Sequence, residues 1–413
     1  MRLREIYLFL SNFVARIAVF MVYKSFMSNI FVPKNILYIL LLLTCGSVSA
    51  RPIWVSLYNS QQLRQIVVSA YDSPLTVSAD DSTEFVIPAG QAVYAALREG
   101  KIHISDMRGE VGAFERFAVQ GTVIRLVPVS PQAEIRNYEG TVSMSVDINR
   151  ILMINKVDEE PYIAGVVEAE TGQGQTFEFY KAKAVTCRTY LYGNIGKHEN
   201  EGFHLCDEVH CQAYKGQRPS RNIILPAVEA TKDIVINSRK DGKLILAAYH
   251  SNCGGETESA QNAWQSHLPY LVPVTDPYCT SLANARWQKI ISLDDWINYL
   301  VKNGFKLNPN VVTDFSFRQF HRIPNYQVNN FTMPVRQIRN DWQLRSTFFS
   351  LSVEDGNVIL NGFGYGHGVG LCQEGAMEMG RRGFKYDEII RFYYRDVNLV
   401  PVNTLQIRIP EFN

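Results

Sequence analysis

Five glycines alternate with larger residues between Gly362 and Gly370, and this pattern restricts the possible local folds more than any other part of the sequence. The segment reads NGFGYGHGVGLCQ over residues 361–373. In an extended chain the glycines share one face, and Tyr365 and His367 lie on the other. A face without side chains allows a ligand or another backbone to lie close to it. A bulged hairpin packed on a helix would use the same glycines, but a histidine among them suggests a site. The spacing is not that of a dinucleotide-binding loop.

The overall composition is that of a folded protein without a polyanionic partner. The chain has 413 residues, of which 46% are hydrophobic and 20% are charged. These values exclude a disordered or collagen-like chain. The 41 basic and 40 acidic residues give a formal net charge of +1, so nucleic acid is not an expected partner.

The first 50 residues have the pattern of a secretory signal. An apolar run, Ile36–Leu43, follows Lys24 and Lys34 and precedes small residues that end at Ala50. We therefore predict cleavage after Ala50 and export to the periplasm or cell envelope. An uncleaved membrane anchor in residues 1–50 is the alternative, and it would be the only membrane contact. Export would place the remaining cysteines where disulfides can form.

The rest of the chain predicts an α+β fold. Residues 51–130 show short strands and polar turns, which indicate a small β-rich module ending at a linker near Pro128–Ala133. Residues 131–413 mix strands and helices and are expected to form one larger domain. The predicted strands are 53–57, 65–69, 84–87, 122–127, 141–146, 151–155, the paired strands 234–237 and 243–249, and several between 307 and 360. The predicted helices are 162–168, a Thr176-capped helix to about 194, 294–302 with Ser292 as its cap, 373–382 and 386–394.

Two of these helices carry acidic and basic residues that could act together in a site. Glu168 and Glu170 end the first helix, and Lys181 and Arg188 lie on the second. Seven residues correspond to about 700° of helical turn, so the two cations share nearly the same face. A carboxylate beside two cations stays ionised, whereas a general acid needs a pKa raised by burial. Sequence does not decide between these effects, and a solvated charged face would contain the same residues.

Four soft or borderline metal ligands lie within eight residues. They are His204, Cys206, His210 and Cys211, and these side chains suit Zn²⁺. The spacing is not that of a zinc finger. We expect a structural zinc ion rather than a catalytic one, because a catalytic site needs an open position and a nearby base. A disulfide between the two cysteines, or free thiols, would also fit the sequence.

A dense polar and aromatic set follows in residues 250–270. Aromatic rings stack on the apolar faces of sugars, and amides pair with hydroxyl groups, so this composition favours sugar binding. An ordinary polar loop is the simpler alternative. Cys253 lies three residues after His250, but a disulfide with Cys279 fits Cys253 as well as a nucleophilic role does. The predicted substrate-binding residues are Glu258, Ser259, Asn262 and Trp264, together with Tyr365 and Gln373 from the glycine-rich segment.

In chain order, four segments resemble the sporulation stage II protein D and amidase-enhancer family, SpoIID/LytB. They read IAGVVEAETG, KAKAVTCRTY, YHSNCGGETESAQNAW and GYGHGVGLCQEGAMEMGRRGFKYDEIIRFYY. The resemblance extends from roughly residue 135 to residue 400. Three cysteines depart from the family pattern: Cys187 stands where alanine is usual, and Cys253 and Cys372 stand where serine is common.

The resemblance implies a peptidoglycan lytic transglycosylase. Such an enzyme cleaves MurNAc–GlcNAc bonds of glycan strands, preferably strands that an amidase has denuded, and leaves 1,6-anhydroMurNAc ends. The family's catalytic glutamate falls on Glu170, its helix cations on Lys181 and Arg188, and its Gly-His-Gly segment on His367. Where the family has a zinc site, it falls in residues 204–211. A cell-wall amidase is the partner that the resemblance suggests.

Three other functions agree with the same sequence. The chain could be a non-catalytic wall-binding or amidase-enhancing protein, because the family includes such members. It could be a zinc hydrolase that uses residues 204–211, or a structural protein of the envelope. A role in spores does not follow, since these motifs also occur outside spore formers.

Overall fold

The described chain forms one compact unit that begins at Arg51. The predicted signal segment, residues 1–50, lies outside the described residues. No helix in the described ranges is both long and apolar enough to cross a membrane. The residues that the computed structural model describes are 51–80, 83–217, 221–308 and 313–412.

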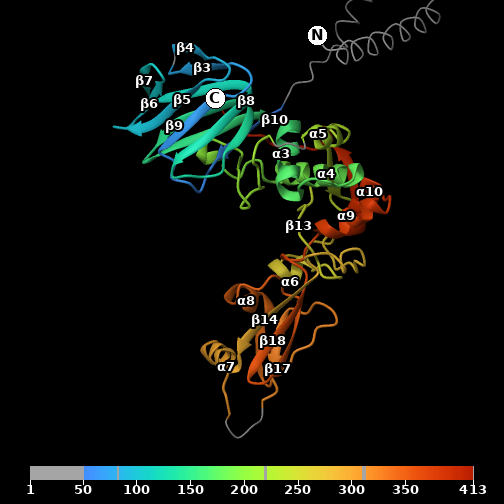
Figure 1. Cartoon of the computed structure of the whole chain (residues 1–413). Coiled ribbons are helices and arrows are strands. Elements are labelled where there is room, and N and C mark those ends of the chain that lie inside the picture. The colour runs from blue at the N-terminus through green and yellow to red at the C-terminus, as the bar shows by residue number, and fades with distance from the viewer. Residues whose placement is uncertain (1–50, 81–82, 218–220, 309–312, 413) are drawn as a thin grey trace, which may run out of the picture. The chain divides into compact units, whose positions relative to one another are not determined.

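A large mixed sheet contains the first strands of the chain (Figure 1). Its strands are β1 (Pro52–Leu57), β2 (Gln65–Ala70), β3 (Leu75–Ala79), β4 (Thr83–Ile87), β5 (Ala92–Arg98), β6 (Lys101–Asp106), β7 (Gly109–Phe114), β8 (Arg116–Ser130), β9 (Arg136–Asp147), β10 (Arg150–Asp158) and β11 (Leu205–Cys206). The order is β11-β1-β10-β9-β8-β2-β5-β6-β7, and β3 pairs with both β4 and β8. Every strand predicted before residue 156 lies within one of these strands.

The sheet continues through the expected module boundary. Strand β8 runs to Ser130, inside the predicted linker, and pairs antiparallel with β9. Strand β1 pairs antiparallel with β10 and parallel with β11, so the start of the chain lies against strands that come much later. The β-rich character of residues 51–130 is therefore present, but a separate small module is not confirmed.

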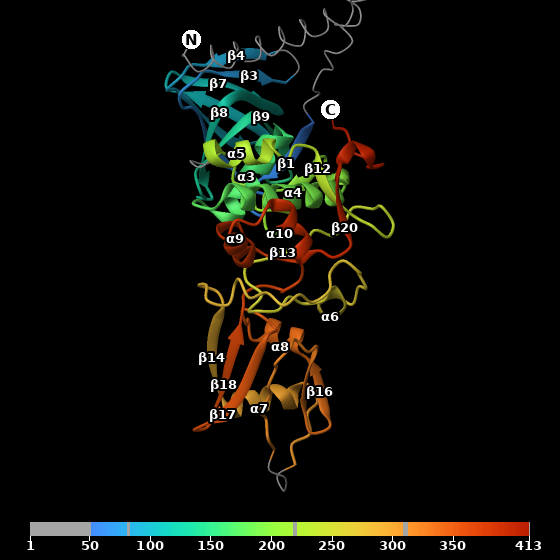
Figure 2. The ribbon, with the colours of Figure 1, turned by 90° about the vertical axis from the view of Figure 1, so that its right-hand side faces the viewer.

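Helices α3, α4 and α5 pack together next to this sheet, and α4 also contacts α9 and α10 (Figure 2). The Thr176 side chain accepts a hydrogen bond from the backbone N–H of Phe179, which confirms the predicted cap of α4. Cys372 caps α9 in the same way, through the N–H of Gly375. The helices of this group are α3 (Glu159–Thr171), α4 (Phe177–Asn194), α5 (Arg221–Glu229), α9 (Gln373–Arg381) and α10 (Tyr386–Tyr393).

Residues 286–363, here called the insert lobe, enclose a second hydrophobic core around Trp296 and Leu360. Ser292 caps α7 as predicted, through the N–H of Asp295. The short helix α8 was not predicted, because its sequence VRQIRND has no clear apolar face. The elements of this lobe are β14 (Arg286–Ser292), α7 (Leu293–Lys302), β15 (Asn325–Val328), β16 (Phe331–Pro334), α8 (Val335–Asp341), β17 (Phe349–Glu354) and β18 (Asn357–Phe363).

The predicted pairing of 234–237 with 243–249 is wrong apart from a single bridge between Asn237 and Leu244. Instead, β12 pairs antiparallel with β20, and β13 pairs parallel with β19. The remaining elements are β12 (Ile234–Ser238), β13 (Tyr249–His250), α6 (Ala260–Trp264), β19 (Leu371–Cys372), β20 (Val397–Pro401) and the 3₁₀ turns η1 (Glu199–Glu201) and η2 (Val402–Thr404).

The glycine-rich segment is not an extended strand with one bare face. Strand β18 ends at Phe363, and the following glycines have positive φ angles, for example +78° at Gly364 and +73° at Gly370. A Cβ atom at Gly364 would meet the backbone of Asn252, and one at Gly370 would meet the carbonyl of Ala248. The glycines are therefore required for the close approach of another backbone. The sequence predicted that either a ligand or another backbone would lie close to them.

Candidate functional site

Glu170 lies in the last turn of α3, where the loop after β11 covers it. One carboxylate oxygen, Oε1, accepts a hydrogen bond of 3.2 Å from the backbone N–H of Ala213. The side chain is half-buried. Its charge also acts on Lys183, Cys187 and Tyr249, which places these side chains close to the carboxylate.

Lys183 is the cation beside Glu170, and sequence reasoning missed it. Its side chain is fully buried, and its ammonium lies 2.9 Å from the centre of the Tyr249 ring. Nζ has no hydrogen-bond partner among the described residues. Burial lowers the pKa of Lys183, while Cys187 and Glu170 oppose that shift. An unpartnered buried ammonium near a carboxylate is an uncommon arrangement, and it is typical of functional sites.

Lys181 and Arg188 share one face of α4 as predicted, but that face points away from Glu170. Two residues correspond to roughly 200° of helical turn, so Lys183 lies on nearly the opposite side of α4 from Lys181. Lys181 pairs with Glu178 at 3.0 Å. Neither cation forms a hydrogen bond or an ion pair with Glu170 among these described side chains.

Arg188 is a buried connector of three helices. Its side chain has no solvent exposure, and it binds Glu159 at 2.8 Å and Glu160 at 2.6 Å. It also donates a hydrogen bond of 2.8 Å to the carbonyl of Thr231, just after α5. These contacts join the start of α3 to α4 and α5, so Arg188 supports the scaffold that carries Glu170.

Tyr249 connects Glu170 to His367. Burial raises the pKa of the Tyr249 hydroxyl well above its usual value, and the charges of Cys187 and Glu170 raise it further. The backbone carbonyl of Tyr249 accepts a hydrogen bond of 3.0 Å from Nε2 of His367. Nδ1 of His367 accepts one from the N–H of Val369, also 3.0 Å long. The backbone therefore engages both ring nitrogens of His367, and a catalytic role for this residue stays a prediction.

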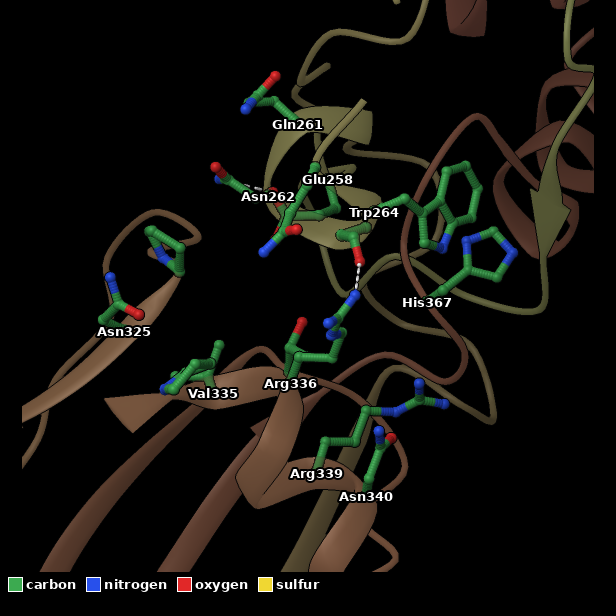
Figure 3. Close-up of a pocket in the computed structure, with 15 residues that line it drawn as sticks. Glu258, Gln261, Asn262, Trp264, Asn325, Val335, Arg336, Arg339, Asn340 and His367 are labelled. Atoms are coloured by element: carbon green, nitrogen blue, oxygen red, sulfur yellow. Dashed lines mark hydrogen bonds between the residues drawn. The ribbon is translucent and has the colours of Figure 1, made fainter. Parts of the chain in front are cut away.

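A pocket of about 340 Å³ lies between α6 and the insert lobe (Figure 3). The Trp264 indole packs at a tilt against the His367 ring at its wall, with ring centroids 5.2 Å apart. Arg339 of α8 also faces the pocket, and its Nε is buried without a hydrogen-bond partner among the described residues. The pocket thus combines an aromatic surface, amides and a guanidinium group. Glu170 is not among its lining residues.

Glu258 is a second carboxyl group at this site, and it lines the pocket directly. It is 4% exposed, and burial raises its pKa although Arg322 opposes the shift. Oε1 accepts hydrogen bonds from the N–H of Ser259 and from the Asn262 amide, at 2.9 and 3.0 Å. A fixed carboxyl group with a raised pKa can donate a proton or a hydrogen bond. Its role as a substrate ligand stays a prediction.

The other predicted binding residues are placed less uniformly. Asn262 and Trp264 line the pocket, whereas Ser259 uses its hydroxyl to cap α6. Tyr365 is 47% exposed, and Arg345 lies over its ring. Gln373 begins α9, and its side-chain oxygen is buried without a hydrogen-bond partner among the described residues.

Three of the four predicted metal ligands lie close together, and His198 joins them in place of His204. The ligand atoms of His198, Cys206, His210 and Cys211 lie within 4.8 Å of one another. His204 is not part of the cluster, because its Nδ1 accepts a hydrogen bond from the N–H of Trp54 and its Nε2 lies 2.9 Å from the carbonyl of Pro410. A pattern of spacing alone gave no reason to include His198, which lies eight residues before Cys206.

The surroundings of this cluster fit a zinc ion. Nδ1 of His198 lies 2.5 Å from the Glu201 carboxylate, which leaves Nε2 to face Cys211 at 3.4 Å. Carboxylate support of the second ring nitrogen is common for histidines that bind zinc. A hydrogen bond from Cys206 is the main cause that lowers the pKa of Cys211 to about 7, which favours the thiolate that zinc requires. All six described cysteines are free thiols.

Comparison with known proteins agrees with the resemblance of the four segments. A family model described as stage II sporulation protein matches residues 147–237. The chain is 30% identical over 275 residues to an uncharacterized protein of Brachyspira hyodysenteriae, covering 64% of this chain and 73% of that protein. The chain belongs to the SpoIID/LytB family.

Named relatives are more distant. Stage II sporulation protein D of Bacillus amyloliquefaciens is 27% identical over 284 residues, which cover 65% of this SpoIID/LytB chain and 81% of that protein. The amidase enhancer of Bacillus subtilis is 25% identical over 290 residues, or 57% of this chain and 40% of that protein.

His367 should make this SpoIID/LytB protein less stable as the pH falls below neutrality. Burial is the main cause that lowers its pKa from 6.5 to about 4. Between these values the unfolded chain binds more protons than the folded chain, so stability rises with pH. In urea unfolding from pH 4.5 to 7, His367→Gln should reduce this slope by at most about 1.4 kcal/mol per pH unit. His204 and His250 also have lowered pKa values, so part of the slope should remain. If the slope of stability against pH were the same in His367→Gln as in the parent protein, the lowered pKa of His367 would be contradicted.

Proposed function

We propose that the protein is an exported lytic transglycosylase that cleaves MurNAc–GlcNAc bonds of peptidoglycan, with Glu170 as its acid and base. The observation that carries this proposal is the placement of Glu170. It is a half-buried carboxylate at a helix end, fixed by the Ala213 N–H and adjacent to the Tyr249 hydroxyl and the Lys183 ammonium. Family membership supports the substrate class.

In the proposed reaction, one carboxyl group acts twice. Glu170 protonates the glycosidic oxygen, and the MurNAc ring passes through an oxocarbenium-like state. The resulting carboxylate then removes the proton from the C6 hydroxyl of the same sugar. The C6 oxygen attacks C1 and closes the 1,6-anhydro ring. The donated proton stays on the hydroxyl of the leaving GlcNAc, and the C6 proton restores the acid form of Glu170. Neither water nor a second carboxylate takes part, in contrast to hydrolases with two carboxylates.

Neighbouring residues would orient the carboxyl group during this cycle. The Ala213 N–H holds one oxygen, and the Tyr249 hydroxyl provides a second polar contact. Lys183 would stabilise the negative charge on Glu170 after proton donation, because its buried ammonium is close enough for the two charges to interact and has no hydrogen-bond partner among the described residues. Preorganised charges of this kind are effective in a site that excludes water.

Zinc bound by His198, Cys206, His210 and Cys211 would have a structural role. Cys211 lies two residues before Ala213, which donates its N–H to Glu170. An ion at this position would supply rigidity to the loop that holds the carboxylate. All four positions of a tetrahedral ion would be taken by protein ligands, as is typical of structural zinc.

The pocket beside Trp264 suits a denuded glycan strand. An amidase leaves a free lactyl carboxylate on each MurNAc, and Arg339 offers a buried Nε without a partner among the described residues. The indole of Trp264 could stack on a sugar ring, and Glu258 and Asn262 could pair with hydroxyl groups. These residues therefore support a glycan-binding subsite in this pocket.

The proposal is tested by incubating the purified protein with intact sacculi and with amidase-denuded glycan. We expect soluble, peptide-free glycan fragments from the denuded glycan and much slower release of fragments from intact sacculi. Stimulation of an amidase on intact sacculi, with glycan binding but no fragment release, would replace the proposal with the amidase-enhancing role. The Bacillus subtilis relative is named amidase enhancer, and this name favours the second candidate.

A further inference from the structure

A second cluster of thiols is buried away from the first one. Cys253, Cys279 and Cys372 have no solvent exposure, and neither does Asp276 beside them. Their ligand atoms lie within 4.8 Å of one another. The Cys253 sulfur is 3.3 Å from the Cys279 sulfur and 3.2 Å from Oδ2 of Asp276. Ligands bound at 2.0–2.3 Å around a tetrahedral ion lie roughly 3.5–3.8 Å apart, so small shifts of these side chains would centre an ion.

The backbone around this cluster already directs N–H groups toward the sulfur atoms. The Cys372 sulfur accepts hydrogen bonds from the N–H groups of Cys253 and Gly375, at 3.3 and 3.4 Å. Such bonds stabilise thiolates, and bound metal ions normally have supporting contacts of this type around their ligands.

The carboxylate is oriented as a ligand with one oxygen toward the thiols. Oδ1 of Asp276 accepts a hydrogen bond of 2.8 Å from the N–H of Tyr278, while Oδ2 faces Cys253. The Tyr393 hydroxyl donates to Oδ2 at 3.0 Å. A buried carboxylate among three thiols is costly unless a cation compensates its charge.

We propose that Cys253, Asp276, Cys279 and Cys372 form a second, structural zinc site. Three thiolates and one carboxylate are a soft, tetrahedral ligand set, which favours Zn²⁺ over Mg²⁺ or Ca²⁺. The ion would join the loop after β13, the 276–279 turn and the first residue before α9, which are far apart in sequence. Binding would release the protons of the thiols as they become thiolates. The site does not depend on the proposed function.

The test counts metal ions in the full-length protein purified without chelators and loaded with Zn²⁺. Elemental analysis should give two zinc ions per chain. Cys372→Ser should retain one, because serine can still cap α9 but is a poor zinc ligand. Asp276→Asn is a second variant for the same site. The matched control, Cys206→Ser with Cys211→Ser, should also retain one ion, and combining Cys372→Ser with this pair should leave none.

Cobalt substitution distinguishes the two sites spectroscopically. Thiolate-to-Co²⁺ absorption reports on the number of bound sulfur atoms, so the three-thiolate site should absorb more strongly than the two-thiolate site. Loss of that stronger band in Cys372→Ser, with unchanged circular dichroism, is the expected result. The proposal would be overturned if the parent protein bound one zinc ion and Cys372→Ser still bound that ion. A Cys253–Cys279 disulfide, seen by mass spectrometry of the unreduced protein, would also overturn it.

Discussion

Replacing Glu170 with glutamine should reduce glycan cleavage by about 10²–10⁴-fold, the contribution usual for a general acid–base group. Glutamine cannot donate or accept the transferred proton. Its carbonyl oxygen can still accept the Ala213 N–H bond that holds Oε1 of Glu170. The fold and glycan binding should therefore be retained. The measurement compares kcat on denuded glycan for the parent protein and Glu170→Gln, with glycan binding measured separately by pull-down.

Glu258→Gln is the matched control, because Glu258 is the competing carboxyl group at the pocket and has a raised pKa. We expect this change to increase KM more than it lowers kcat, since Glu258 would bind substrate. A large loss of kcat in Glu258→Gln with near-normal turnover in Glu170→Gln would contradict the assignment. In that case Glu258 would be the proton donor.

Replacing Arg188 with methionine should lower the free energy of unfolding by about 3–5 kcal/mol. The change removes the ion pairs that Arg188 forms with the buried Glu159 and the half-buried Glu160, although Arg51 stays 3.9 Å from Glu159. Burial already raises the pKa of Glu160 although Arg188 opposes it, so loss of Arg188 should raise that pKa further. The folded chain would then bind protons more readily than the unfolded chain. The difference in unfolding free energy between the parent protein and Arg188→Met should therefore become smaller as the pH falls toward 4. Urea unfolding at several pH values measures this.

Two controls separate the buried charge from general damage to α4. Arg150→Met removes a more exposed ion pair with Asp147 and should cost no more than about 1 kcal/mol. Combining Arg188→Met with Glu159→Gln and Glu160→Gln removes the uncompensated carboxylates and should recover part of the lost stability. If the triple variant were no more stable than Arg188→Met, the buried carboxylates would not be the cause of the loss.

Local chemistry made several elements predictable. Thr176 and Ser292 have hydroxyl groups that cap helices, and the helices begin where those residues predict. Strand pairing was less accessible. Strand β12 pairs with β20, more than 150 residues later, rather than with the segment directly after it. Alternation of apolar residues identifies a strand and its buried face, but it contains no information about the partner.

The sequence predicted which segments form the candidate site, but not which of their side chains come together. Periodicity placed Lys181 and Arg188 on one face of α4, yet it could not show that Glu170 lies near the opposite face, so Lys183 was missed. His198 was missed because the chain folds back between it and Cys206. Asp276 carried no signal, because its neighbours Cys253 and Cys372 are brought to it only by the tertiary fold.

The most direct test of the central claim is the chemistry of the new glycan ends. Denuded glycan would be digested in H₂¹⁸O and the fragments analysed by mass spectrometry. The intramolecular mechanism predicts 1,6-anhydroMurNAc ends without ¹⁸O, produced by the parent protein and not by Glu170→Gln. Reducing MurNAc ends that carry ¹⁸O would show that water attacks C1, and they would contradict the transglycosylase mechanism.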